Sequence, residues 1–142
     1  MLTCGDTFLI PKRGKDIEHL WIVITEPDAD GNAVCVSVTA KRSYSDTTVV
    51  LSAGEHPFIK HESAIHYADA RILDLEKVQA ALDAHTRTFI CRSHKPCSED
   101  LLTRVQDGLL KSPYPTKGIN SFEYVYHDSK AYVRVGLRGR AG

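Results

Sequence analysis

Length and charge set the first limits on this chain. It has 142 residues, enough for one domain with its own apolar core, and 18 Lys and Arg side chains balance 18 Asp and Glu. This balance excludes a global basic field of the kind that attracts nucleic acid, although a local patch can still be basic. No apolar run approaches the ~18 residues that span a bilayer, and the first residues lack the apolar core of a secretion signal. We therefore expect a soluble, cytoplasmic, single-domain protein without membrane contact.

The first half of the chain is typical of short β-strands. LWIVIT is a continuous run of large, mostly β-branched residues, AVCVSVT alternates, and Asp30-Gly31 between them is a turn signal. The patterns predict six strands, over 7–10, 20–25, 33–39, 47–51, 63–67 and 70–73.

Two helices are predicted to follow. Asp74 suits an N-cap, and apolar residues recur at helical spacing through residue 84. Ser98 suits the cap of a second helix, with Leu101, Val105 and Leu109 on one face and Pro113 beyond its end. The pattern over 88–91 predicts one more strand, and 113–142 either a hairpin or an arm.

Strands first and helices afterwards favour a mainly β fold with helical additions. We expect a small, strongly bent antiparallel barrel over approximately 1–73, a helical part over approximately 74–112, and no alternating βαβ units.

Residues 54–67, GEHPFIKHESAIHY, hold the densest group of titratable side chains. His56, His61 and His66 lie within these fourteen residues, with Lys60 and Ser63 between them. Histidine has an unperturbed pKa of about 6.5, so such a turn can carry both an acid and a base near neutral pH.

The four cysteines leave a zinc site as an alternative. Cys91, His94 and Cys97 form C-x2-H-x2-C, and Cys4 or His85 could complete a ligand set. There is no CxxC pair, however, so we favour reduced thiols, no metal and no cofactor, with Cys35 packed as a small apolar residue.

The order of motifs resembles the MazF/PemK family of toxin endoribonucleases. The likeness rests on Gly5-Asp6 before the strand TFLI, the basic loop KRGK, the strand LWIVIT, the strand end VSVT, and the outline of residues 54–82. The histidine-rich turn departs from the family's common form. The resemblance implies an SH3-like barrel that forms a homodimer, cleaves single-stranded RNA without metal, and is neutralised by a small antitoxin protein in a type II toxin–antitoxin system.

The resemblance also implies site residues. Arg13 and Thr39 would hold the scissile phosphate, and to them the sequence itself adds His56 and His61 as candidate acid and base. The residues that we expect to contact the RNA are Lys12, Lys15, Lys41, Arg42, Tyr44, Lys60 and Ser63.

Each assignment has an alternative. Arg13 and its lysines also suit a solvated loop, Thr39 a plain strand position, and His56 a turn before Pro57. Ser63 also suits a local backbone bond, and His66 a packed side chain. If these readings hold, the protein is a non-catalytic SH3-like module that binds RNA or a protein partner.

Overall fold

The computed structural model describes residues 1–11, 18–84, 92–114, 119, 123–125 and 132–134. The predicted site residues Lys12, Arg13 and Lys15 lie outside these ranges. So do the predicted strand over 88–91 and two of the candidate zinc ligands, His85 and Cys91.

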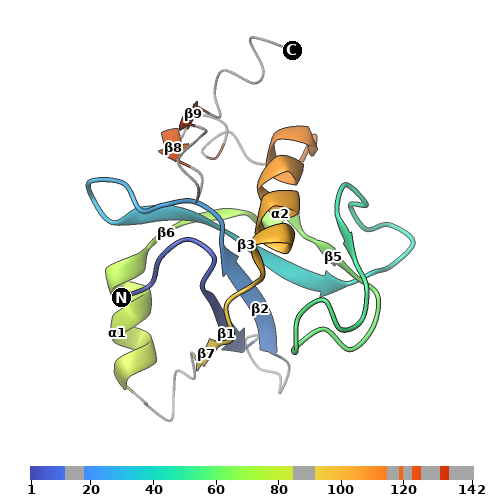
Figure 1. Ribbon diagram of the computed structural model, residues 1–142, viewed down its shortest axis with the longest axis horizontal. Helices are drawn as coiled ribbons and strands as arrows, with labels where there is room; N and C mark the ends of the chain where they lie inside the picture. Colours follow the sequence, from blue (N-terminus) through green and yellow to red (C-terminus); the bar gives the residue numbers. More distant parts are fainter. Residues whose placement is uncertain (12–17, 85–91, 115–118, 120–122, 126–131, 135–142) are drawn as a thin grey trace.

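One antiparallel sheet organises the described part of the chain (Figure 1). Its strand order is β4-β5-β3-β2-β1-β7, and β6 pairs with β3 beside β5. The strands are β1 (Thr7–Pro11), β2 (Glu18–Val23), β3 (Asn32–Ala40), β4 (Val50–Leu51), β5 (Ser63–Ile65), β6 (Arg71–Asp74) and β7 (Arg92–His94).

The long strand β3 lies at the centre. β5 and β6 together line one of its edges, separated only by a short 3-10 turn, η1 (Tyr67–Asp69). The other edge of β3 pairs with β2.

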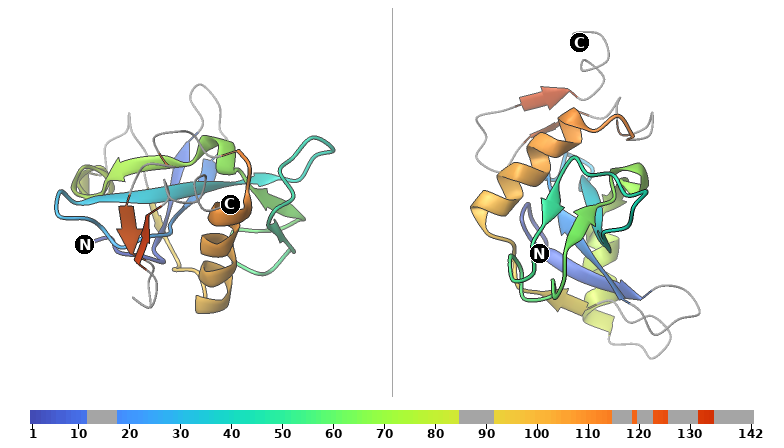
Figure 2. Two further views of the ribbon diagram at one scale, coloured as in Figure 1. Left: turned by 90° about the horizontal axis from the view of Figure 1, so that it is seen from above. Right: turned by 90° about the vertical axis from the view of Figure 1, so that its right-hand side faces the viewer.

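Two helices bury opposite faces of this sheet. Val34 and Val36 of β3 belong to one apolar cluster with α2 (Glu99–Lys111), whereas Ala33 and Cys35 belong to another with α1 (Leu75–Ala84). Because successive strand residues point to opposite faces, the two clusters lie on either side of the sheet. Figure 2 shows the two helices well apart from each other, with α2 in orange and α1 in yellow-green.

Both predicted helix caps are confirmed. The Ser98 hydroxyl accepts a hydrogen bond from the Leu101 amide at 3.2 Å, and a carboxylate oxygen of Asp74 accepts one from the Glu76 amide at 3.0 Å. These bonds satisfy amides of the first turn that have no partner within the helix.

The prediction of a mainly β fold with two helices is confirmed, but two details differ. The predicted strand over 47–51 was wrong in extent, because only Val50 and Leu51 pair; Asp46 instead holds Thr48 in a turn. The sequence also missed β7. In the C-terminal region, β8 (Glu123–Val125) pairs antiparallel with β9 (Tyr132–Arg134), as the hairpin alternative expects. The described pairings leave β4 and β7 as the two ends of an open path, so barrel closure stays a prediction.

No helix within the described ranges is long and apolar enough to cross a membrane.

Gly108 tests how closely α2 approaches the sheet. A Cβ atom at this position would lie 2.1 Å from the Tyr67 hydroxyl oxygen and 2.5 Å from a Val49 methyl. The same Tyr67 hydroxyl donates to the Val105 carbonyl at 2.7 Å, so it is not free to move. We predict that Gly108→Ala lowers the free energy of unfolding by about 1–3 kcal/mol, measured by urea denaturation, although alanine favours helix. Asp107→Ala, on the exposed neighbouring position, is the control; equal stability of the two variants would contradict this packing.

Candidate functional site

The candidate site begins where β3 changes partner. The last described β2–β3 pair is Trp21–Ser37, and beyond it Val38, Thr39 and Ala40 pair only with β5 among the described residues. The start of β2, however, continues to pair with β1 down to Glu18. The two strands therefore part, and a gap opens between the start of β2 and the end of β3.

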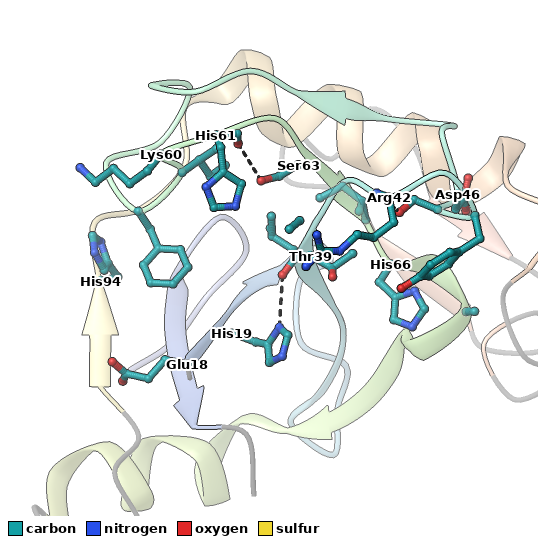
Figure 3. Close-up of a pocket in the computed structure, with 18 of the residues that line it drawn as sticks. Glu18, His19, Thr39, Arg42, Asp46, Lys60, His61, Ser63, His66 and His94 are labelled. Atoms are coloured by element: carbon teal, nitrogen blue, oxygen red, sulfur yellow. Dashed lines mark hydrogen bonds between the residues drawn. The ribbon is translucent and has the colours of Figure 1, made fainter. Parts of the chain in front are cut away.

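A cavity of about 1080 Å³ occupies this gap. Its floor is the end of β3, and its walls come from the start of β2, the turn after β3, the segment before β5, and η1 (Figure 3). Apolar side chains that line the cavity include Val38, Phe58, Ile59 and Ile65. Polar and charged side chains that line it are Glu18, His19, Thr39, Arg42, Tyr44, Ser45, Asp46, Lys60, His61, Ser63, His66, His94 and Tyr114.

His19 is held by the backbone of the opposite strand. Its Nδ1 lies 3.4 Å from the Val38 carbonyl oxygen. In a regular β2–β3 ladder this oxygen would instead accept a hydrogen bond from a backbone amide of β2. A carbonyl can only accept, so Nδ1 carries the hydrogen in this contact. The other ring nitrogen, Nε2, is then the one that has a lone pair to accept a proton.

The segment before β5 brings His61 and Lys60 to the cavity. Two backbone hydrogen bonds of 2.9 Å, from Gly54 to Ile59 and from Ile59 to His56, fold the segment on itself. Gly54 has a φ of 92°, a conformation that favours glycine. Figure 3 shows the His61 ring directed into the hollow from this segment and the His19 ring approaching it from β2.

Ser63 makes the local bond that was its alternative assignment. Its hydroxyl is buried and donates to the His61 carbonyl at 2.9 Å. It therefore fixes the backbone that carries His61 while lining the same cavity.

The turn after β3 supplies Arg42 and Tyr44, and Asp46 anchors this turn to α2. Asp46 accepts hydrogen bonds from the Thr48 amide and hydroxyl at 2.8 and 2.6 Å, and from the buried Ser112 hydroxyl at 2.8 Å. Tyr44 itself is 85% exposed.

Arg42 and Lys60 have no ion-pair partner among the residues that the structure describes, and both line the cavity. Lys41 differs, because its ammonium pairs with Glu62 at 3.2 Å and it does not line the cavity. Asp46, one of the two lining carboxylates, already accepts three hydrogen bonds. The cavity lining therefore holds two cations that form no ion pair among the described residues, together with the carboxylates of Glu18 and Asp46.

His56 lies behind the cavity wall and does not line it. The ring is 2% exposed, Nε2 lies 2.6 Å from the Lys95 carbonyl oxygen, and Nδ1 accepts a hydrogen bond from the Phe58 amide at 3.1 Å. Burial lowers the pKa of His56, and the nearby His94 and Lys95 lower it further, against the opposing effect of the Lys95 carbonyl. With both nitrogens engaged, this ring is not available for proton transfer to a substrate.

The structure thus gathers most of the predicted residues at one cavity: Thr39, Arg42, Tyr44, Lys60, His61 and Ser63. Lys41 and His56 stand apart, and Lys12, Arg13 and Lys15 lie outside the described ranges. Two histidines differ from their expected places. His56, a candidate acid or base, is buried with both ring nitrogens engaged, and His66, expected to be packed, is exposed and lines the cavity.

Sequence reasoning missed His19, Glu18, Asp46, His94 and Tyr114 as cavity residues. A signal existed for His19, since it directly precedes the apolar run of β2 and so marks the start of a buried strand. Nothing in the pattern indicated the others.

Among the described residues, no three His, Cys, Asp or Glu side chains are grouped so that they could hold a metal ion. Burial raises the pKa of the Cys97 thiol to about 11.

The sequence matches no known protein-family model, and no curated protein is significantly similar to it.

Asp46 tests how the cavity wall is anchored. We predict that Asp46→Ala lowers the free energy of unfolding by about 1–3 kcal/mol, because the three hydrogen bonds that Asp46 accepts from Thr48 and Ser112 are lost together. Asp69→Ala, which removes only an exposed ion pair with Arg71, is the matched control and should cost below about 1 kcal/mol. Denaturant melts of both variants check this, and a smaller loss for Asp46→Ala would contradict the anchor.

Proposed function

We propose that this protein is a metal-independent endoribonuclease that cleaves single-stranded RNA at the cavity between β2 and β3, and that it acts as the toxin of a type II toxin–antitoxin system. The observation that carries the proposal is that two differently held imidazoles, His19 and His61, line one cavity with Thr39 and with Arg42 and Lys60, two cations that form no ion pair within the described ranges.

Cleavage of RNA through its own 2′-hydroxyl needs a base, an acid and a cation. His19 is the better base, because the Val38 carbonyl fixes the hydrogen on Nδ1 and leaves Nε2 to take the 2′-hydroxyl proton. The resulting alkoxide attacks phosphorus. The bond from phosphorus to the 5′-oxygen breaks, giving a 2′,3′-cyclic phosphate and a 5′-hydroxyl.

His61 is the better acid, since its exposed ring enters the cavity from the side opposite His19 and can protonate the departing 5′-oxygen. Arg42 and Lys60 would stabilise the charge that grows on the phosphate oxygens, and the Thr39 hydroxyl can donate to one of them. A guanidinium suits this role because its fork pairs with two phosphate oxygens at once.

The resemblance to the MazF/PemK family supplies the rest of the proposal. It includes Arg13, Lys12 and Lys15 as phosphate contacts from the segment between β1 and β2, which is followed by the cavity residues Glu18 and His19. It also includes a homodimer and a small antitoxin protein that covers the site.

A second function is favoured by one specific observation. Phe58 and Ile59 form an apolar part of the cavity wall, and Tyr44 is exposed at the same cavity. Such a surface suits base stacking or an apolar anchor of a partner without any turnover. A non-catalytic module that binds RNA or a protein is therefore the alternative.

Cleavage of a labelled single-stranded RNA in EDTA separates the two functions. We predict cleavage by the wild type, with cyclic-phosphate ends, and losses of about 10²- to 10⁴-fold in kcat for His19→Ala and for His61→Ala. Arg42→Ala should lower kcat/KM, because it removes charge from the site.

Lys77→Ala, on the exposed face of α1, is the matched cation control and should cleave like the wild type. RNA binding with no cleavage would favour the binding module. Cleavage that survives in both histidine variants would contradict the assigned site, and cleavage abolished by EDTA would contradict the metal-independent mechanism.

A further inference from the structure

Two histidines hold the backbone of Lys95 beside the cavity, one at its carbonyl and the other at its amide. The Lys95 carbonyl oxygen accepts from the Thr7 hydroxyl at 2.7 Å and lies 2.6 Å from His56 Nε2, while the Lys95 amide donates to His94 Nδ1 at 2.8 Å. The two imidazole rings are 4.9 Å apart. This junction joins β1, the segment after β7 and the segment before β5.

The hydrogen bonds fix the tautomer of His56. Its Nε2 faces a carbonyl and must donate, whereas its Nδ1 faces the Phe58 amide and must accept, at 3.1 Å. The neutral ring with hydrogen on Nε2 satisfies both contacts, and no other protonation state does. His56 therefore ties the Phe58 amide to the fixed Lys95 backbone.

The chain from Phe58 runs directly to Lys60 and His61, which line the cavity together with Phe58 and Ile59. The backbone bond from the Ile59 amide to the His56 carbonyl extends the same tie by one residue. The geometry of His56 thus sets the position of the wall that carries the proposed acid.

We propose that His56 is a positioning residue: its neutral ring holds the 58–61 segment against the cavity, and its protonation releases that segment. A proton on Nδ1 places two donors face to face, so the bond to the Phe58 amide is lost. The inference rests on the proposed function only for its catalytic readout, because the release itself can be measured without RNA.

The groups around His56 favour its neutral form. His94 faces it from β7 and Lys95 from the segment that follows; both are like charges when protonated. On its own segment, the Glu55 carboxylate is engaged by Arg104 and by the Ser52 amide. Thr7 of β1 is uncharged. The lowered pKa of His56 agrees with this environment.

The effect on stability has a definite sign. The unfolded chain binds the proton near the ordinary pKa of about 6.5, whereas the folded chain binds it only at lower pH. The contribution of His56 to stability is therefore complete above about pH 6.5, and falls as the pH drops from there through the folded pKa. Release of the segment occurs in the lower part of that window.

Two variants test separately the hydrogen bonds made by the two ring nitrogens of His56. His56→Asn places an amide oxygen near the position of Nδ1 and can keep the Phe58 bond, whereas His56→Gln reaches the position of Nε2 and can keep only the Lys95 bond. Neither side chain titrates. His94→Asn is the matched control, because it removes the neighbouring imidazole but leaves His56 in place.

The measurement is the pH dependence of the Phe58 and Lys60 amide resonances in the full-length protein between pH 5 and 8, using ¹⁵N labels. We expect one shared step in the wild type and in His94→Asn, and no such step in His56→Asn. Cleavage of RNA should fall with the same step in the wild type. At pH 7.5, kcat should fall about tenfold in His56→Gln with KM changed less than twofold, and His56→Asn should restore most of it.

A Phe58 amide that does not shift with pH in the wild type would overturn the proposal, as would a step that persists in His56→Asn. If no RNA is cleaved but the step appears as expected, the proposed function fails and the positioning role stands. If RNA is cleaved and the step is missing, only the positioning role fails.

Discussion

The change of partner by β3 is the constraint on which the site depends. As far as Ser37 this strand pairs with β2, and from Val38 onward with β5 alone within the described chain, while β2 stays with β1. The divergence leaves backbone acceptors of β3 without a ladder partner, and the Val38 carbonyl meets the His19 ring instead. The same divergence provides the volume that the cavity fills. Because α1 and α2 bury both faces of the sheet, the gap is held open by packed layers on either side and not by a loop alone.

Three histidines around this gap have different roles, and the backbone groups that each ring contacts determine the role. His19 is half-buried at a strand start and has one nitrogen fixed by a carbonyl, so its other nitrogen is oriented. His61 is exposed on a folded segment and has a free ring among the described residues. His56 is buried with both nitrogens engaged, so it contributes to the position of the segment and not to proton transfer. Spacing along the chain does not separate His56 from His61, since both lie in the same histidine-rich segment.

The sequence predicted the local elements well because their signals are local. Hydrophobic periodicity and the caps at Asp74 and Ser98 depend on residues a few positions apart, and both helices and most strands follow from them. The failures concern long-range contacts. β7 pairs with β1 across more than eighty positions, and His94 and Tyr114 reach the cavity from segments far along the chain. Likewise, His56 Nε2 is engaged by the Lys95 carbonyl, a hydrogen-bond partner 39 residues away that no motif indicates.

The most direct test of the account is to map where a single-stranded RNA binds. We propose a titration of the labelled protein with a short oligonucleotide whose 2′-oxygens are methylated, so that it binds without reacting. The account predicts that the largest shifts occur in the His19 and His61 ring resonances and in the Thr39 and Arg42 amides, with little change along α1. Shifts centred on α1, or no shift at any residue of the cavity at millimolar RNA, would contradict it.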